Sequence, residues 1–187
     1  PADGRQAFER YFVNCLNVRV AYFNNVALTG PESVLNALYS LGVGLPPVQN
    51  VLVAAIFLSL RMGYRDVIVL GADHSWHQSL ILDDANRVCA RDRHFYDPDA
   101  ELKPFGQGEF TMDTLFFALG RMFAGYWALQ KYAVHRGVRV INASSTSFID
   151  AFERKPLALA LDTLVGGSPD SPAERSKAAT DMTDRLG

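Results

Sequence analysis

Residues 66–84 read DVIVLGADHSWHQSLILDD, and they give the clearest indication of the fold class. Residues 67–70 are an unbroken aliphatic run, which is typical of a strand covered on both faces in a parallel sheet. Gly71 ends the run, and residues 72–77 then bring together a carboxylate, two imidazoles, a hydroxyl and an indole. Open α/β sheets bind ligands beyond the carboxyl ends of their strands. The stretch therefore predicts a buried strand that leads into a ligand-binding loop, with an ordinary polar surface loop as the alternative.

A second aliphatic strand is predicted at residues 138–141, after a long helix over residues 112–135 that Gly137 ends. The expected wide apolar face of this helix comprises Leu115, Phe116, Leu119, Phe123, Tyr126, Trp127 and Tyr132. A strand, a helix and a second strand form a βαβ unit, whose crossover makes the two strands parallel. The polar turns that follow the two strands, residues 71–77 and 142–147, are therefore expected side by side at one edge of the sheet.

These elements predict an α/β fold with a Rossmann-like parallel sheet flanked by helices. We assign residues 1–165 to this domain and the Gly-, Ser-, Pro- and charge-rich residues 166–187 to a loose polar tail. The chain begins with PADGRQAF and has no initiator methionine, so we expect that it is the C-terminal part of a longer chain.

Periodicity and the positions of Gly and Pro predict the remaining segments. They are a helix over residues 5–16, a strand over residues 18–23, a helix between Pro31 and Gly42, an apolar and buried helix from Pro46 and Pro47 to about Met62, an irregular charge-rich insertion between Trp76 and Gly108, and a helical segment over residues 148–154.

Composition narrows the class of protein. With 187 residues and 49% hydrophobic content the chain is long enough to bury a core, and its net charge of −2 gives no broad basic surface for nucleic acid. Cys15 and Cys89 have no paired spacing, which disfavours a disulfide scaffold and suits a reducing cytoplasm. The longest apolar stretch, residues 51–60, is half the roughly 20 residues of a membrane-spanning helix. We expect a cytoplasmic protein, with peripheral contact at the inner face of the membrane left open and no oligomeric state indicated.

His94 is the strongest single catalytic candidate. An imidazole titrates near neutral pH and accepts a proton from a substrate hydroxyl. Arg91 and Arg93 flank it with guanidinium groups that bind phosphate oxygens in a bidentate fork. Tyr96 and Trp76 are candidates for stacking on a base or a sugar. The competing interpretation is an exposed charged loop with two aromatic residues at the edge of the core.

A metal site is not expected, although several side chains are of metal-ligating type: Asp73, His74, His77, Asp83, Asp84 and His94. His74 and His77 lie three positions apart without the HExxH pattern. The chain also lacks GxSxG, GxGxxG and GxxxxGK[ST], so the sequence argues against a nucleophile-elbow hydrolase, a standard dinucleotide site and a P-loop.

The second polar turn carries Asn142 and then Ser144, Ser145, Thr146 and Ser147. Because it follows a strand and precedes a predicted helix, its hydroxyls and backbone N–H groups are placed to meet a phosphate at a helix N-terminus. The alternative is that one of these residues is simply the helix N-cap.

The order of these motifs resembles that of the bacterial lipooligosaccharide sialyltransferases and their relatives, the motility-associated factor glycosyltransferases and the 6-hydroxymethylpterin diphosphokinase-like proteins. The resemblance covers about residues 44–155. It is carried by an ordered set of short motifs: MGYRD at 62–66, VIVLGAD at 67–73, HFY at 94–96, VRVIN at 138–142 and SF at 147–148.

In the sialyltransferases a CMP-sugar donor lies across a Rossmann-like sheet, and the histidine of a His-Tyr pair is the general base without a required metal. The resemblance implies that His94 is this base, although Phe95 stands where the pair has its tyrosine and the family's Gly-rich N-terminal segment is not found. Residue chemistry and the resemblance together give the candidate substrate- and nucleotide-binding residues Gly71, Asp73, His74, Ser75, Trp76, Arg91, Arg93, Tyr96, Asn142, Ser144, Ser145 and Ser147.

The resulting hypothesis is a glycosyltransferase-like enzyme that transfers sugar from a nucleotide-sugar donor to a glycan acceptor in cell-surface polysaccharide or lipopolysaccharide biosynthesis, with no cofactor required. One alternative is a 6-hydroxymethylpterin diphosphokinase-like transferase, in which Asp83 and Asp84 help to bind Mg²⁺ through water. The other is a non-catalytic module that binds a nucleotide or a sugar.

Overall fold

The structure is a computed structural model, and it describes residues 9–12, 17, 20, 22–91, 102–104 and 110–165. Residues 9–12 are helical. The further elements are α2 Glu32–Leu41, α3 Val51–Arg61, β1 Asp66–Val69, the 3₁₀ helix η1 Trp76–Ser79, β2 Leu80–Leu82, β3 Val88–Arg91, β4 Leu102–Pro104, α4 Met112–Arg136, β5 Arg139–Asn142, β6 Glu153–Arg154 and α5 Leu157–Val165. The mixture of helices and strands confirms the α/β class.

The central sheet is parallel, as the βαβ pattern predicts. Its strand order is β1-β5-β6, and both pairs of neighbours run parallel. Asp66 of β1 lies opposite Arg139 of β5, and Val69 lies opposite Asn142. The Arg139 Nε also donates to Asp66 Oδ1 at 2.6 Å, which ties the two strand starts together at the surface.

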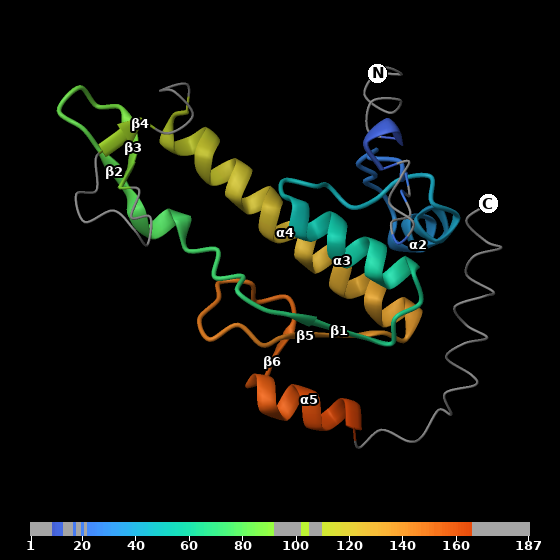
Figure 1. Cartoon of the computed structure of the whole chain (residues 1–187). Helices are drawn as coiled ribbons and strands as arrows, with labels where there is room; N and C mark the ends of the chain where they lie inside the picture. The colour runs from blue at the N-terminus through green and yellow to red at the C-terminus, as the bar shows by residue number, and fades with distance from the viewer. Residues whose placement is uncertain are drawn as a thin grey trace.

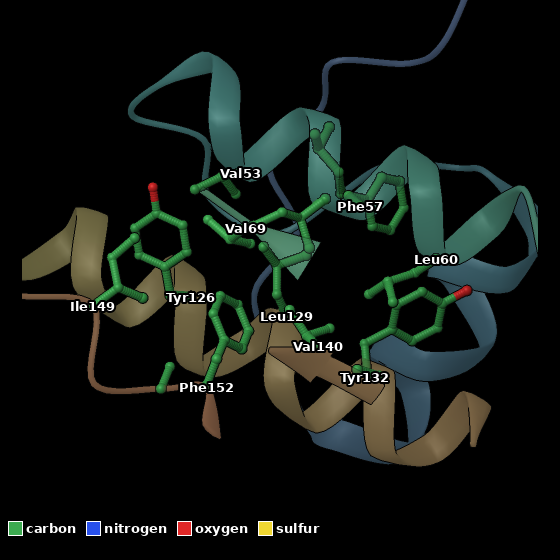
Figure 2. Packing of buried hydrophobic residues seen from close by; sticks show 14 of the residues in the cluster. Val53, Phe57, Leu60, Val69, Tyr126, Leu129, Tyr132, Val140, Ile149 and Phe152 are labelled. Atoms are coloured by element: carbon green, nitrogen blue, oxygen red, sulfur yellow. The ribbon is translucent and has the colours of Figure 1, made fainter. Parts of the chain in front are cut away.

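One face of the sheet is covered by α3 and α4, which lie side by side across it (Figure 1). Figure 2 shows the core between these layers, where the side chains of Phe57 and Leu60 from α3 and Leu129 and Tyr132 from α4 gather around the sheet. Tyr132 packs edge-on against Tyr39 of α2, so α2 joins the same core. The opposite face of the sheet carries a smaller apolar cluster, formed by Ile68, Ile141, Ala143 and Ala160 of α5.

Helix boundaries follow local chemistry. α2 ends at Gly42 with φ 73° and α4 ends at Gly137 with φ 65°, the left-handed conformation that glycine adopts at low cost. α3 begins later than the prolines suggest. Its N-cap is Asn50, whose Oδ1 accepts a hydrogen bond from Val53 N at 3.1 Å, so the predicted start at Pro46 and Pro47 is wrong by several residues.

Two other predicted segments are also wrong. Of the strand expected over residues 18–23, residues 20, 22 and 23 are described, and none of them is in a strand. The backbone pairs further along the chain instead, in a parallel bridge between Ala27 and Leu45. Residues 148–154 are not helical: residues 148–152 are irregular and β6 follows them.

The expected irregular insertion contains regular structure. η1 starts at Trp76, and β2, β3 and β4 form a second, antiparallel sheet in that order. This small sheet lies near the N-terminal end of α4, away from the parallel sheet (Figure 1). The apolar face of α4 is also narrower than predicted, because Phe116 and Trp127 are exposed. The predicted tail, residues 166–187, lies outside the described residues.

The packing of α4 against α3 and the residues just before it gives a test of the fold at two glycines of α4. A methyl group at Gly125 would approach the Pro47 carbonyl oxygen to 2.8 Å, whereas no described atom lies within 4 Å of the same position at Gly120. We expect Gly125→Ala to lower the free energy of unfolding by about 1–3 kcal/mol, because the backbone must move apart. The control Gly120→Ala should raise it by about 0.5–1 kcal/mol through helix propensity. Urea unfolding of both variants measures the difference, and equal effects would contradict this packing.

Candidate functional site

The two polar turns meet at the carboxyl ends of β1 and β5, which confirms their predicted adjacency. Ala72 N donates to Ser144 Oγ at 3.1 Å, and Ser147 Oγ donates to Ala72 O at 2.6 Å. Further along, Phe148 N donates to Asp73 O at 2.8 Å. Three hydrogen bonds therefore join the loop after β1 to the loop after β5 at one edge of the sheet.

The side chains of the second loop are occupied by this internal network. Asn142 Nδ2 donates to Ser147 Oγ at 2.8 Å and to Ile149 O at 3.2 Å, and its Oδ1 accepts from Ser144 N. Ser147 Oγ also accepts from Ile149 N, which completes the hydrogen-bonding capacity of its hydroxyl. Asn142, Ser144 and Ser147 therefore shape the loop, and their direct contact with a ligand stays a prediction. Ser145 is exposed.

Arg154 is a structural residue of this loop that the sequence did not reveal. Its guanidinium donates to three backbone carbonyls, those of Ser144 at 3.3 Å, Ser145 at 2.9 Å and Ser147 at 3.2 Å. The sequence predicted a helix over residues 148–154, at whose N-terminus the Ser147 carbonyl would have had a backbone partner. In the structure the arginine supplies partners for all three carbonyls and so holds the loop in a non-helical form.

His74 is the most constrained residue of the first loop. It is 6% exposed and has φ 56°, a left-handed conformation that is uncommon for a residue with a Cβ. Its Nε2 lies 2.5 Å from the Tyr126 hydroxyl of α4 and 3.5 Å from Asn50 Nδ2 at the start of α3. Asn50 Nδ2 donates to the Tyr126 hydroxyl at 3.1 Å. The three side chains form one buried polar cluster, the His74–Tyr126–Asn50 cluster.

Burial governs the protonation of this cluster. Desolvation lowers the pKa of His74, and the nearby Asp73 carboxylate opposes the shift only in part. Desolvation also raises the pKa of the Tyr126 hydroxyl to about 12, against a smaller lowering by its hydrogen bond with Asn50. The cluster is therefore neutral near pH 7. Tyr126 was expected only as part of the apolar face, but a buried tyrosine hydroxyl usually needs a polar partner.

The polar groups that face solvent lie on either side of His74. Asp73 and Trp76 are exposed, and Ser75 is half-buried. The hydrogen bond from Ser75 Oγ to Asp73 Oδ2, at 2.7 Å, is the main cause of a lowered Asp73 pKa, and the His74 backbone N–H adds to it. Asp73 is therefore an ionised carboxylate at neutral pH. The loop begins at Gly71, whose φ of 67° allows the chain to turn away from the strand.

The residues of metal-ligating type do not converge in the part of the chain that the structure describes. His77 packs edge-on against Phe148 at 4.4 Å between ring centroids, while His74 bonds to Tyr126. The described residues contain no group of three or more His, Cys, Asp or Glu side chains placed to hold a metal ion. Asp83 forms a salt bridge of 2.8 Å with Arg87, so its carboxylate already has a cationic partner.

The predicted catalytic segment lies mostly outside the described residues. His94, Arg93 and Tyr96 belong to the range 92–101, of which the structure describes nothing. Arg91 is the last residue of β3, where it lies opposite Leu102 of β4. The assignments of His94 as a base and of Arg91, Arg93 and Tyr96 as ligand-binding residues stay predictions.

Comparison of the chain with protein-family models, with curated proteins and with solved structures finds no significant match in any of the three. Within the described ranges, no helix combines the length and apolar character that crossing a membrane requires.

The buried histidine predicts a specific pH dependence of stability. In the unfolded chain His74 takes up a proton as the pH falls through about 6.5, but its folded-state pKa is lower. Between these two pKa values the unfolded state binds the extra proton, so stability is lost as the pH falls below about 6.5, by at most about 1.4 kcal/mol per pH unit. His74→Asn, which keeps a residue tolerant of positive φ, should flatten the curve in this window. Urea unfolding at pH 5 to 7.5 tests this, with His77→Asn as control; an unchanged slope in His74→Asn would contradict it.

Proposed function

We propose that this protein is a glycosyltransferase-like enzyme, similar to the sialyltransferases, which binds a nucleotide-sugar donor and a glycan acceptor at the carboxyl edge of a Rossmann-like parallel sheet. The observation that carries the proposal is the hydrogen-bonded contact between the loops that follow β1 and β5. Ligands of open α/β sheets bind at this edge.

The edge has the rigidity that a transferase site needs. Transfer between two substrates depends on holding the reacting atoms in a fixed geometry, which is worth several kcal/mol of the barrier. Here the first loop is anchored by His74 in the buried cluster and the second by Arg154 on three carbonyls. The exposed polar groups Asp73 and Ser145 are thus attached to fixed backbone.

The chemical step of the proposal is assigned to His94. In this mechanism His94 takes the proton of an acceptor hydroxyl, while Arg91 and Arg93 offset the charge of the donor phosphates. His74 is less suitable as the base, because its Nε2 is bonded to Tyr126 and desolvation lowers its pKa. We place the reaction in cell-surface polysaccharide or lipopolysaccharide assembly on the cytoplasmic side of the membrane, with no added cofactor. The diphosphokinase alternative gains no support from Asp83, whose carboxylate is paired with Arg87.

Donor binding gives the first test of this proposal. A ligand at about 100 times its dissociation constant adds roughly 2.7 kcal/mol to stability, which corresponds to a rise in Tm of about 5–10 °C for a chain of this size. We expect CMP or another pyrimidine nucleotide to produce such a shift without Mg²⁺. The panel contains CMP, UDP, GDP and ATP, each with and without Mg²⁺. A shift with ATP that requires Mg²⁺ would favour the diphosphokinase alternative, and no shift with any nucleotide would refute donor binding.

The assignment of the general base is tested separately, with the nucleotide sugar that the panel identifies. His94→Ala should lower turnover by about 10²–10⁴-fold and leave donor affinity nearly intact, since proton transfer is needed in the transition state rather than in the ground state. Turnover, donor affinity and Tm are measured on the same variant. A variant with wild-type turnover would remove His94 from the mechanism, and a fall in all three quantities together would indicate a structural histidine.

A further inference from the structure

The two loops at the carboxyl edge contain no lysine or arginine. Residues 70–79 and 143–152 include Asp73 and Asp150 but no lysine or arginine. The next basic residue along the chain, Arg154, already donates to three carbonyls of the second loop. Phosphate groups are usually held by Arg or Lys side chains or by helix N-termini. The side chains of these two loops therefore suit an uncharged ligand rich in hydroxyl groups better than a phosphate.

Trp76 offers such a ligand a partly exposed aromatic surface. The indole is 46% exposed, and its ring lies 4.6 Å from the His74 ring between centroids, at an interplanar angle of 42°. Its backbone starts η1, where Ser79 Oγ donates to Trp76 O at 2.8 Å. The face of an aromatic ring is electron-rich and attracts the weakly positive C–H groups of a sugar ring. Because its ring already contacts the His74 ring, the indole loses less side-chain entropy on binding than an aromatic side chain without such a contact.

Asp73 supplies the complementary hydrogen-bond acceptor. Its Oδ1 accepts from His74 N at 2.8 Å and its Oδ2 accepts from Ser75 Oγ at 2.7 Å. An ionised carboxylate accepts about four hydrogen bonds, so an exposed one with these two partners has lone pairs left for ligand hydroxyls. Hydrogen bonds to a charged acceptor are about twice as strong as neutral ones.

We propose that Trp76 and Asp73 form a subsite for a neutral pyranose ring, which stacks on the indole while its hydroxyls donate to the carboxylate. His74 positions both residues, since its backbone N–H bonds to Asp73 and its ring contacts Trp76. The subsite rests on the proposed glycosyltransferase function and specifies it: these loops bind the sugar, of the donor or of the acceptor, and the donor phosphates are left to Arg91 and Arg93.

The test measures binding of the methyl glycosides of glucose, galactose and N-acetylglucosamine to the whole chain. Saturation-transfer NMR detects this binding. We expect at least one glycoside to bind with a dissociation constant of about 1 mM, the weak end of specific recognition. Trp76→Ala should weaken this binding at least tenfold, and Asp73→Asn should weaken it several-fold. The matched controls are Trp127→Ala, whose indole is 47% exposed, and Asp162→Asn on α5; both should bind the glycoside as the wild type does.

Nucleotide binding by the same variants separates this inference from the proposed function. The subsite is supported if Trp76→Ala loses glycoside binding but keeps the nucleotide-induced Tm shift. If the nucleotide sugar competes with the glycoside and the free nucleotide does not, the subsite belongs to the donor sugar. If glycosides bind through Trp76 and no nucleotide shifts the Tm, the subsite stands and the glycosyltransferase proposal fails. The subsite is overturned if no glycoside binds the wild type, if Trp76→Ala binds glycosides normally, or if this variant loses the nucleotide shift, which would place a base on the indole.

Discussion

The hydroxyl of Tyr126 imposes the constraint on which the candidate site depends. It lies in the core between α3, α4 and the end of β1, and a buried hydroxyl without a partner costs about 1–3 kcal/mol. Asn50 and His74 supply its partners, and each serves a second purpose: Asn50 caps α3, and His74 anchors the loop after β1. The positive φ of His74 is a cost that this hydrogen bonding offsets. One buried polar group thus fixes a helix start and a ligand-facing loop together.

The parts of the fold that follow from short-range signals could be predicted from the sequence. The aliphatic runs of β1 and β5, the periodicity of α4 and the left-handed glycines 42 and 137 all act within a few residues. The errors occur where contacts with residues outside the segment determine its backbone structure. Residues 148–154 have a helical composition, but Asn142 bonds to the Ile149 carbonyl and Arg154 to the Ser147 carbonyl, which a helix would have paired internally. The antiparallel sheet of β2, β3 and β4 was hidden by the charged and turn-forming residues around its short strands.

The candidate site likewise has features that the sequence predicted and features that it did not. The adjacency of the two polar loops follows from the βαβ pattern, because neighbouring parallel strands end at the same edge of a sheet, so the sequence predicted it correctly. The sequence did not show which loop residues are structural and which face a ligand, because whether a serine bonds to a ligand or to its own backbone depends on three-dimensional contacts. Ser147 is fully engaged by the loop, whereas Asp73 and Trp76 face outward. Tyr126 bonds to residues that are far away in the sequence, and Arg154 bonds to a loop where a helix was expected. No sequence motif marks either set of hydrogen bonds.

The parallel pairing of β1 with β5 also has a kinetic consequence. Asp66 and Arg139 are 73 positions apart, so their pairing requires closure of a long segment of chain. Closing a loop becomes more costly with length, whereas helices and antiparallel hairpins form from local contacts within microseconds. During folding, α4 and the antiparallel sheet are therefore expected to appear before the edge that carries Asp73 and Trp76. That edge exists only when the long-range contacts close, so it is expected to form late in folding.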